Sequence, residues 1–367
     1  MSDIKVTVVM PIYNAYDYLR PALDSVIDQT LREIEIICID DGSTDPTLSV
    51  LKEYQKLDGR VRLVTENNAG VSVARNKGLV RARGEYVIFL DADDFFELTM
   101  LERLYATAKE QDLDIAVCGY DMYNDKAASF EKSIDGEVET LFSEGECVSK
   151  ASLPDTIFQS TTGYVWNKLL KTSFLHDKSL TFAPELYVFE DVYFVLTVLS
   201  MAERVGRLKD VLIHHRIYST QSRPKLFKKY YHQIPTVYGK AKQFLVSRGM
   251  YIPLSRSFLN VSVSRCYKIY NLLWNDAKGA FWDTLHDGAA DSLGWFAHEA
   301  SEFESRELYE FAANVGLYTH DQFVKIEGKK KRPNSERFNK DGLNKKIKKI
   351  KKRERIKEFF MRHSKKK

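Results

Sequence analysis

Four short apolar runs near the start of the chain constrain its fold more than any other feature. They cover residues 4–10, 34–40, 61–65 and 86–90, they are rich in β-branched residues, and segments with helical spacing separate them. Short apolar strands that alternate with helices are typical of a parallel sheet with crossover helices. The sequence therefore predicts an α/β fold for the first half of the chain.

The ends of these runs carry polar sequences: PIYN at 11–14, DDGS at 40–43, ENNAG at 66–70 and DADD at 91–94. In open α/β sheets, ligands bind outside the carboxyl ends of the strands. We therefore expect all four segments to meet at one edge of the sheet and to form the functional site there.

Composition and the N-terminus narrow the class of protein. The chain has 367 residues, of which 44% are hydrophobic and 29% are charged, as in folded globular proteins. Its apolar runs are far shorter than the roughly 20 residues of a membrane-spanning helix. The start, MSDIKVTVVMPIYNA, lacks the features of a secretory signal, so we expect a cytoplasmic protein.

Charge is distributed unevenly. Residues 329–367 hold 19 Lys or Arg and 4 Asp or Glu, a net charge of +15, which leaves −11 for the rest of a chain whose total is +4. Polybasic segments are attracted to anionic membranes. We expect this tail to attach the protein to the inner face of the plasma membrane; a nucleic-acid tail and simple solubilising disorder are the alternatives, and no aromatic RNA-binding motif supports the former.

Asp91 and Asp93 directly follow the fourth apolar run. Alternate carboxylates at a strand end can share one divalent cation, and hard oxygen ligands suit Mg²⁺ or Mn²⁺. Taken alone, an Asp-x-Asp sequence is also common in surface loops.

Two further segments have both a functional and a structural interpretation. Asp40 and Asp41 follow an apolar strand, where a nucleotide base could satisfy one carboxylate, although a turn capped by Asp45 before Pro46 also explains the segment. Arg75 brings positive charge toward the acidic strand ends, or is simply an exposed helix charge.

Taken together, the motifs resemble inverting glycosyltransferase family 2 and its GT-A fold. The resemblance covers about residues 4–220, and five segments carry it: PIYN at 11–14, QT at 29–30, EIICIDDGSTD at 35–45, NAGVSVARNKG at 68–78 and GEYVIFLDADD at 84–94. It implies a Rossmann-like, mostly parallel central sheet with an acceptor-side region after it.

The resemblance also implies roles for individual residues in the binding of a nucleotide-sugar donor. Pro11 and Tyr13 would flank the base, Asp41 would accept its N3–H, and Asp91 would approach the ribose. The implied donor-binding residues are Pro11, Tyr13, Asn14, Asp41, Asn68, Arg75, Asp91 and Ala92. Asp93, with Asp91, would bind Mn²⁺ or Mg²⁺ and through it the diphosphate.

On the acceptor side, Glu190 and Asp191 match a Glu-Asp pair of the family. Asp191 would be the general base that takes the proton of the attacking hydroxyl, so that one displacement inverts the anomeric configuration. Favourable placement of two carboxylates at a helix N-terminus is a compatible structural explanation.

Two more segments have less certain parallels. Trp166 and Lys168 match the family's Trp-x-Lys-Leu segment and would contact the acceptor or the sugar, although core packing explains Trp166 equally well. His214 and His215 stand where many relatives carry tyrosines before an arginine, and one of them could complete the metal shell or contact the diphosphate.

The predicted organisation has three parts. Residues 1–222 form the catalytic domain, with a donor half at about 1–120 and an acceptor half at about 121–222. Residues 223–328 show helical spacing and many aromatic residues, which predicts a helical C-terminal domain that could support a homo-oligomer. Residues 329–367 form the polybasic tail.

The predicted function is transfer of a hexose or N-acetylhexosamine from a UDP-sugar to a hydroxyl of a cell-surface glycan, lipid-linked glycan or glycoprotein. A sugar-1-phosphate nucleotidyltransferase is one alternative, but it would carry a glycine-rich phosphate loop where this chain has PIYNA at 11–15. The other alternative is a catalytically inactive donor-binding scaffold.

Overall fold

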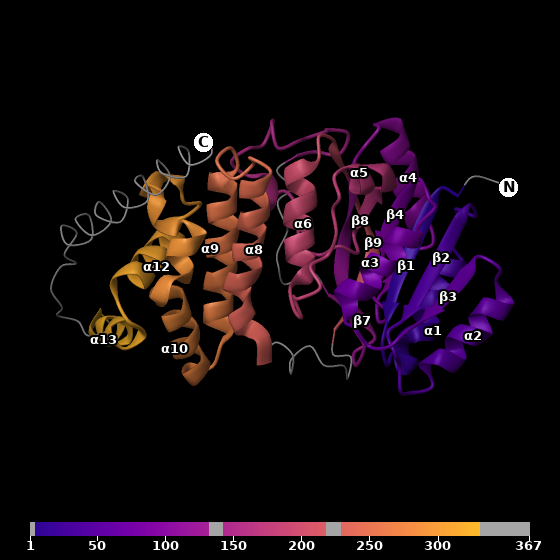
Figure 1. The fold of residues 1–367 in the computed structure, drawn as a ribbon, viewed down its shortest axis with the longest axis horizontal. Helices are drawn as coiled ribbons and strands as arrows, with labels where there is room; N and C mark the ends of the chain where they lie inside the picture. Colours follow the sequence, from indigo (N-terminus) through magenta and orange to yellow (C-terminus); the bar gives the residue numbers. More distant parts are fainter. Residues whose placement is uncertain (1–3, 132–141, 218–228, 331–367) are drawn as a thin grey trace, which may run out of the picture. The chain divides into compact units, whose positions relative to one another are not determined.

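The computed structural model describes residues 4–131, 142–217 and 229–330 (Figure 1). The chain forms two compact units, Met1–Phe227 and Lys228–Lys367. The polybasic tail predicted from Lys329 onward lies almost entirely outside the described residues.

The first unit is built on a nine-stranded sheet with the order β3-β2-β1-β4-β8-β6-β9-β5, and β7 pairs with β6. Its first four strands are parallel: β1 (Val6–Ile12), β2 (Ile34–Asp40), β3 (Val61–Thr65) and β4 (Tyr86–Phe89). Every residue of β1, β2 and β4 is buried, as expected for strands covered on both faces. The parallel strands predicted from the four apolar runs are thus confirmed.

The remaining strands make the sheet mixed. They are β5 (Phe95–Phe96), β6 (Ile115–Asn124), β7 (Ser129–Glu131), β8 (Lys168–Lys171) and β9 (Val205–Ile217). Strand β8 lies antiparallel between β4 and β6, β9 is parallel to β6, and β5 is antiparallel to β9.

Helices cover both faces of this sheet. They are α1 (Tyr16–Ile27), α2 (Thr47–Leu57), α3 (Val71–Arg81), α4 (Met100–Glu110), α5 (Thr172–Asp177) and α6 (Glu190–Met201). Val8 and Met10 of β1 belong to the core that includes Leu23 of α1, whereas Ile37 of β2 packs with Ala74 of α3. Alternate residues of the strands therefore serve two separate layers.

Helix α2 begins one residue later than the sequence indicates. Asp45 and Pro46 predict a cap followed by the first helical residue, but the helix begins at Thr47 with Pro46 before it. The Asp45 carboxylate still accepts the Thr47 N–H at 3.0 Å, and it also accepts the Tyr16 N–H at 3.3 Å. Asp45 therefore connects two loops as well as supporting the helix.

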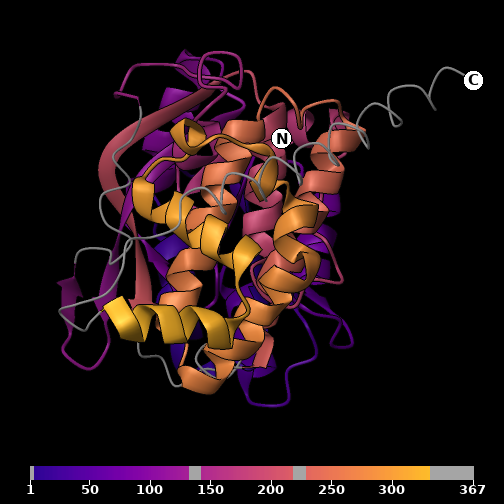
Figure 2. The ribbon, with the colours of Figure 1, turned by 90° about the vertical axis from the view of Figure 1, so that its left-hand side faces the viewer.

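The second unit is helical throughout its described residues 229–330, as predicted (Figure 2). Its main helices are α8 (Ile234–Ser247), α9 (Ser255–Leu272), α10 (Asn275–Thr284), α11 (Ala290–Leu293), α12 (Arg306–Leu317) and α13 (His320–Lys330). Trp282 and Trp295 are buried, and their indole N–H groups donate to Tyr318 O and Ser262 Oγ, both at 2.9 Å. None of the described helices has the length and hydropathy needed to cross a membrane.

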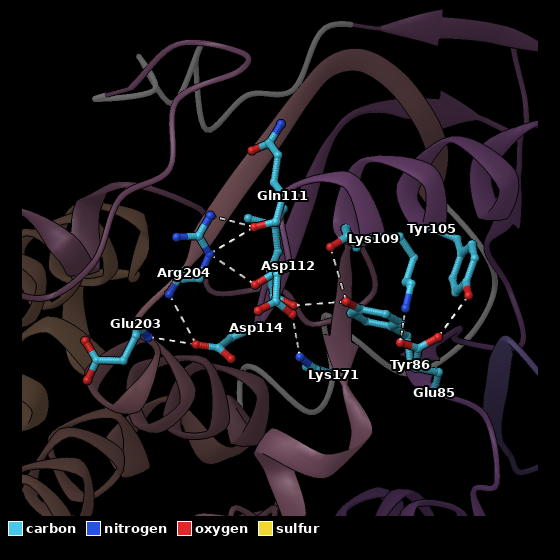
Figure 3. A network of polar contacts seen from close by, with 12 residues as sticks. Glu85, Tyr86, Tyr105, Lys109, Gln111, Asp112, Asp114, Lys171, Glu203 and Arg204 are labelled. Carbon is cyan, nitrogen blue, oxygen red and sulfur yellow. Dashed lines mark hydrogen bonds and ion pairs between the residues drawn. The ribbon is translucent and has the colours of Figure 1, made fainter.

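A network of polar side chains lies at the end of the sheet where β4 begins (Figure 3). Glu85 accepts hydrogen bonds from Tyr105 Oη at 2.9 Å and from Lys109 Nζ at 2.7 Å. Nearby, Lys171 at the end of β8 pairs with Asp112 at 2.7 Å. Because parallel strands β1–β4 end at the opposite edge, this network is structural and is remote from the strand ends predicted to bind ligand.

Glu35 is the most heavily bonded buried carboxylate near the start of the sheet. It accepts hydrogen bonds from Thr7 Oγ1 at 2.8 Å, from Arg62 Nη1 at 2.9 Å and from the Arg83 backbone N–H at 2.7 Å. Burial alone would raise the pKa of Glu35, but these hydrogen bonds outweigh it and hold the pKa below its ordinary value. A lowered carboxyl pKa stabilises the fold at neutral pH, and this stabilisation is lost as pH falls through the folded-state value.

Replacement of Glu35 by Gln should lower the opening free energy of β1 and β2 amides by about 1–3 kcal/mol at pH 7, because charge-assisted hydrogen bonds are lost in a buried site. Native-state hydrogen exchange read by mass spectrometry measures this. Glu33→Gln, which removes only a partly exposed pair with Lys5, is the matched control and should change little. Equal effects of the two substitutions would contradict the assignment.

Candidate active site

The loops after β1 and β2 are tied together by Asn14. Its backbone N–H donates to Ser43 Oγ at 3.0 Å, and its Oδ1 accepts the Thr44 N–H at 2.8 Å. Asn14 has a φ of 48°, a left-handed conformation that Asn tolerates better than most residues. Asn14 therefore shapes the strand ends, and its predicted donor contact stays a prediction.

Asp41 connects the loop after β2 to the loop after β3. Its two carboxylate oxygens accept the N–H groups of Ala69 at 2.8 Å and Gly70 at 2.9 Å. Gly42 next to it has a φ of +76°, and a Cβ there would lie 2.8 Å from Asn68 N, so no other residue fits without strain. The protein itself thus satisfies the buried Asp41 charge, and the predicted contact to a base stays untested.

The other predicted donor residues at these strand ends differ in exposure. Tyr13 is 46% exposed and Asn68 is exposed, whereas Pro11 is buried within β1. Tyr13 and Asn68 are therefore accessible to a ligand, and the predicted base contact of the buried Pro11 stays a prediction.

Three carboxylates gather after β4. Ligand oxygens of Asp91, Asp93 and Asp94 lie within 4.8 Å of one another, and Ala92 between them is buried. Asp94 is only 1% exposed, and it accepts His215 Nδ1 at 2.9 Å and the Arg216 N–H at 2.9 Å. Asp94 therefore anchors the cluster to β9.

Arg75 of α3 joins this cluster to the acceptor side. It is 2% exposed, and its guanidinium contacts Asp91 at 2.7 Å, Glu190 at 2.8 Å and Asp191 at 2.6 Å. Burial alone would lower the pKa of Arg75, but the three carboxylates outweigh this effect and raise the pKa above its ordinary value. One cation faces three carboxylates here, so the group retains negative charge that favours a divalent cation nearby.

Glu190 and Asp191 form the first turn of α6, directly after Phe189. Phe189 has a φ of 58°, which is strained for a bulky residue and is characteristic of functional sites. Burial, with smaller contributions from Glu190 and Asp91, raises the pKa of Asp191 to about 7, although Arg75 opposes the shift. The helix dipole also favours carboxylates at this position, so the two explanations of the pair are compatible.

The two histidines have separate partners. His214 contacts Asp121 through Nδ1 at 2.6 Å and Glu97 through Nε2 at 2.8 Å. These carboxylates outweigh the effect of burial and raise the pKa of His214. Because carboxylates engage both of its ring nitrogens, the structure offers no support for a metal contact by His214, whereas His215 reaches the acidic cluster through Asp94.

Trp166 and Lys168 lie beneath the acceptor side rather than on its surface. Trp166 is 1% exposed and stacks with Tyr164 at 4.7 Å and with His215 at 5.5 Å between ring centroids. Lys168 is 0% exposed. Core packing, the alternative for Trp166, fits this position, and a direct sugar contact by either residue stays a prediction.

Arg216 and Asp94 contribute to the site although the sequence analysis assigned them no role. Arg216 Nε donates to the Asp93 carbonyl at 3.0 Å, and its guanidinium pairs with Asp125. The signal was present in the sequence, since Asp94 directly follows the Asp-x-Asp segment and Arg216 directly follows the two histidines.

Comparisons with known proteins agree with this geometry. The sequence pattern of glycosyl transferase family 2 matches residues 7–163. The putative glycosyltransferase EpsH of Bacillus subtilis is 31% identical over 251 residues, which are 67% of this chain and 70% of EpsH. The chain belongs to glycosyltransferase family 2. The predicted glycosyltransferase class is therefore confirmed.

Two further similarities bear on this family 2 member. The putative teichuronic acid biosynthesis glycosyltransferase TuaG of Bacillus subtilis is 40% identical over 130 residues, 35% of this chain and 52% of TuaG. Residues 1–349 of TarS from S. aureus, solved with UDP, superpose with a TM-score of 0.67 at 21% identity, covering 91% of this chain and 94% of that one. The TarS likeness confirms the predicted GT-A fold with a helical C-terminal region.

Replacement of Arg75 by Met should lower the free energy of unfolding by about 3–5 kcal/mol, because it leaves buried carboxylates without their cation. Their mutual repulsion raises their pKa values, so protonation relieves it and the loss should shrink as pH falls from about 8 to about 5. Urea titrations followed by circular dichroism measure both effects. Arg20→Met breaks an exposed pair with Glu53 and a contact with the Tyr54 ring, and it should change stability little at both pH values.

Proposed function

We propose that this glycosyltransferase moves a hexose or N-acetylhexosamine from a UDP-sugar to a hydroxyl of a cell-surface glycan or glycoconjugate, with inversion. One observation carries the proposal: the buried Arg75 guanidinium joins Asp91 after β4 to the Glu190–Asp191 pair within a single ion-pair group. TarS was solved with UDP and with UDP-GlcNAc, which supports a UDP donor. TuaG, described as a teichuronic acid enzyme, supports a cell-surface acceptor.

The carboxylates after β4 fit a divalent cation. Three oxygen donors within 4.8 Å and excess negative charge suit Mg²⁺ or Mn²⁺. Asp93 and Asp91 would hold the ion, as the family resemblance implies; Asp91 also gives one oxygen to Arg75, and Asp94 is bonded to His215 and Arg216. When bound, the ion neutralises charge on the departing diphosphate.

Asp191 is the proposed general base. Its carboxylate takes the proton of the acceptor hydroxyl while that oxygen bonds to the anomeric carbon; the bond from this carbon to the diphosphate oxygen breaks, and its electron pair leaves with UDP. Glu190 shares Arg75 with the base and so holds the same guanidinium in place. Attack from the face opposite the leaving group inverts the anomeric centre.

Incubation with UDP-glucose, UDP-galactose, UDP-GlcNAc and UDP-GalNAc should release UDP from at least one donor when Mn²⁺ or Mg²⁺ is present, and EDTA should suppress the release. Asp93→Ala should lower the rate on the order of 10²-fold or more, because several kcal/mol of charge stabilisation are lost. Asp112→Ala, remote from the site, is the control and should keep the wild-type rate. Absence of UDP release from every donor would favour the inactive-scaffold alternative.

The rate of UDP release should rise with pH around a midpoint of about 7, because burial raises the pKa of Asp191 to about 7 and only the carboxylate accepts a proton. Asp191→Asn should lower the rate about 10²–10⁴-fold and remove this rise. A pH–rate profile of both proteins measures this. Retained turnover with an unchanged pH dependence in Asp191→Asn would exclude it as the base.

We also propose that the polybasic tail, residues 329–367, holds the enzyme on anionic membranes. Each Lys or Arg near such a surface adds about 1 kcal/mol of attraction. Removal of the tail after Gly328 should therefore abolish sedimentation with phosphatidylserine-containing liposomes at physiological salt, while neutral liposomes bind neither protein. Equal binding of the full and truncated chains to anionic liposomes would contradict this.

A further inference from the structure

Lys168 occupies an unusual position for a lysine. It is the first residue of β8 and pairs with Val117 of β6 within the sheet. Because β8 runs antiparallel to β4, Lys168 lies toward the end of β4 that leads to Asp91, whereas Lys171 lies at the opposite end beside Tyr86. A fully buried amine therefore lies next to the active-site edge.

The ammonium group of Lys168 holds a loop in place. Its Nζ donates to Thr162 O at 2.9 Å, to Tyr164 O at 2.6 Å and to Asn167 Oδ1 at 2.8 Å. Asn167 is fixed in turn, since its Nδ2 donates to Cys118 O at 2.9 Å. All three protons of the ammonium thus have acceptors, and two of these acceptors are main-chain oxygens of the loop at 162–164.

Two buried polar groups near Lys168 take no part in its hydrogen bonds. Among the described residues, Thr162 Oγ1 and Trp166 Nε1 are buried and have no hydrogen-bond partner. Burial of a lysine is unfavourable, and burial lowers the pKa of Lys168 to about 7. An apolar residue would fill the same space with less desolvation, so packing alone does not explain a lysine here.

The loop held by Lys168 contacts the base. The Val165 backbone N–H favours the charged form of the Asp191 carboxylate and so lowers its pKa, and the Lys168 charge attracts the same carboxylate. A Cβ placed on Gly163 would lie 3.0 Å from Val192 Cγ2, which shows how closely the loop approaches the first turn of α6. The loop therefore lies against the first turn of α6, the turn that carries Asp191.

We propose that Lys168 is a positioning residue for the acceptor-side base: it fixes the 162–165 loop so that the Val165 N–H orients one oxygen of Asp191. This inference rests on the proposed role of Asp191. Arg75 of α3 bonds the same carboxylate from another direction, so the two donors together set its orientation. The charged groups that face Asp191 are Arg75, Glu190, Asp91 and Lys168.

Lys168→Met tests the proposal with UDP release from the active donor of the panel. We expect kcat to fall about 10–100-fold, as for a misplaced catalytic group, with KM for the donor and calorimetric binding of UDP within about twofold of wild type. The midpoint of the pH–rate profile should move upward, because the Asp191 carboxylate loses two stabilising contacts. Lys171→Met on the same strand is the control and should change none of these.

Two further variants cover the case in which Lys168→Met does not fold. Lys168→Arg keeps the charge and a donor group and should recover part of kcat. Gly163→Ala leaves Lys168 intact but forces the loop against Val192, and it should lower kcat without weakening UDP binding. If both Lys168→Met and Gly163→Ala fold, normal kcat and an unshifted pH midpoint in both would overturn the proposal. If Lys168→Met is unfolded, normal values in Gly163→Ala alone would overturn it.

Hydrogen exchange separates this proposal from the proposed function. Peptides covering residues 160–166 should lose protection in Lys168→Met and keep it in Lys171→Met, whether or not the enzyme turns over. Unchanged exchange in Lys168→Met would overturn the anchoring role. If Lys168→Met loses this protection but the wild-type chain releases no UDP, the anchoring role of Lys168 is supported and the proposed function is contradicted.

Discussion

The ion pairs of Arg75 are the interaction on which the rest of the site depends. This guanidinium is buried and contacts carboxylates from two separate regions of the chain, Asp91 after β4 and Glu190 with Asp191 at the start of α6. Its helix, α3, is held against the sheet at Gly78, where a Cβ would lie 2.2 Å from Val9 Cγ1. Close packing of α3 thus holds the Arg75 guanidinium in place, and Arg75 in turn sets the spacing between Asp91 and the Glu190–Asp191 pair.

The same ion pairs leave the site with a net negative charge. Arg75 balances one of the three negative charges around it, and Asp93 and Asp94 add two more next to Asp91. His215 and Arg216 of β9 stabilise Asp94 by hydrogen bonds. The protein therefore holds these carboxylates with uncompensated negative charge, which suits the divalent cation proposed for this site.

The fold could be predicted from the sequence because its strands are short, apolar and bounded by polar loops. The parallel strands β1 to β4 match the four apolar runs closely, and their polar ends do meet at one edge. Strand β8 could not be predicted in this way, since four residues are too few to show a period. Its place between β4 and β6 depends on pairing with strands distant in the sequence.

The sequence indicated candidate residues for the site but not the contacts between them. The motifs suggest that Asp91, Asp93 and Asp191 belong to one site, yet spacing alone does not reveal that Arg75 bridges Asp91 and Asp191. Asp41 illustrates the same limit, since its charge is satisfied by main-chain N–H groups of a loop 28 residues away. Contacts of this kind depend on tertiary geometry, which one-dimensional patterns do not encode.

The late position of β8 in the sequence has a consequence for synthesis of the chain. Residues 6–89 contain the four parallel strands, but the neighbour that covers the outer side of β4 is residues 168–171. During translation, β4 is therefore an unpaired, wholly apolar sheet edge until about 80 more residues have emerged from the ribosome. The chain is therefore most exposed to aggregation while only its donor half has been synthesised. Pairing of β8 with β4 completes this part of the sheet and ends that exposure.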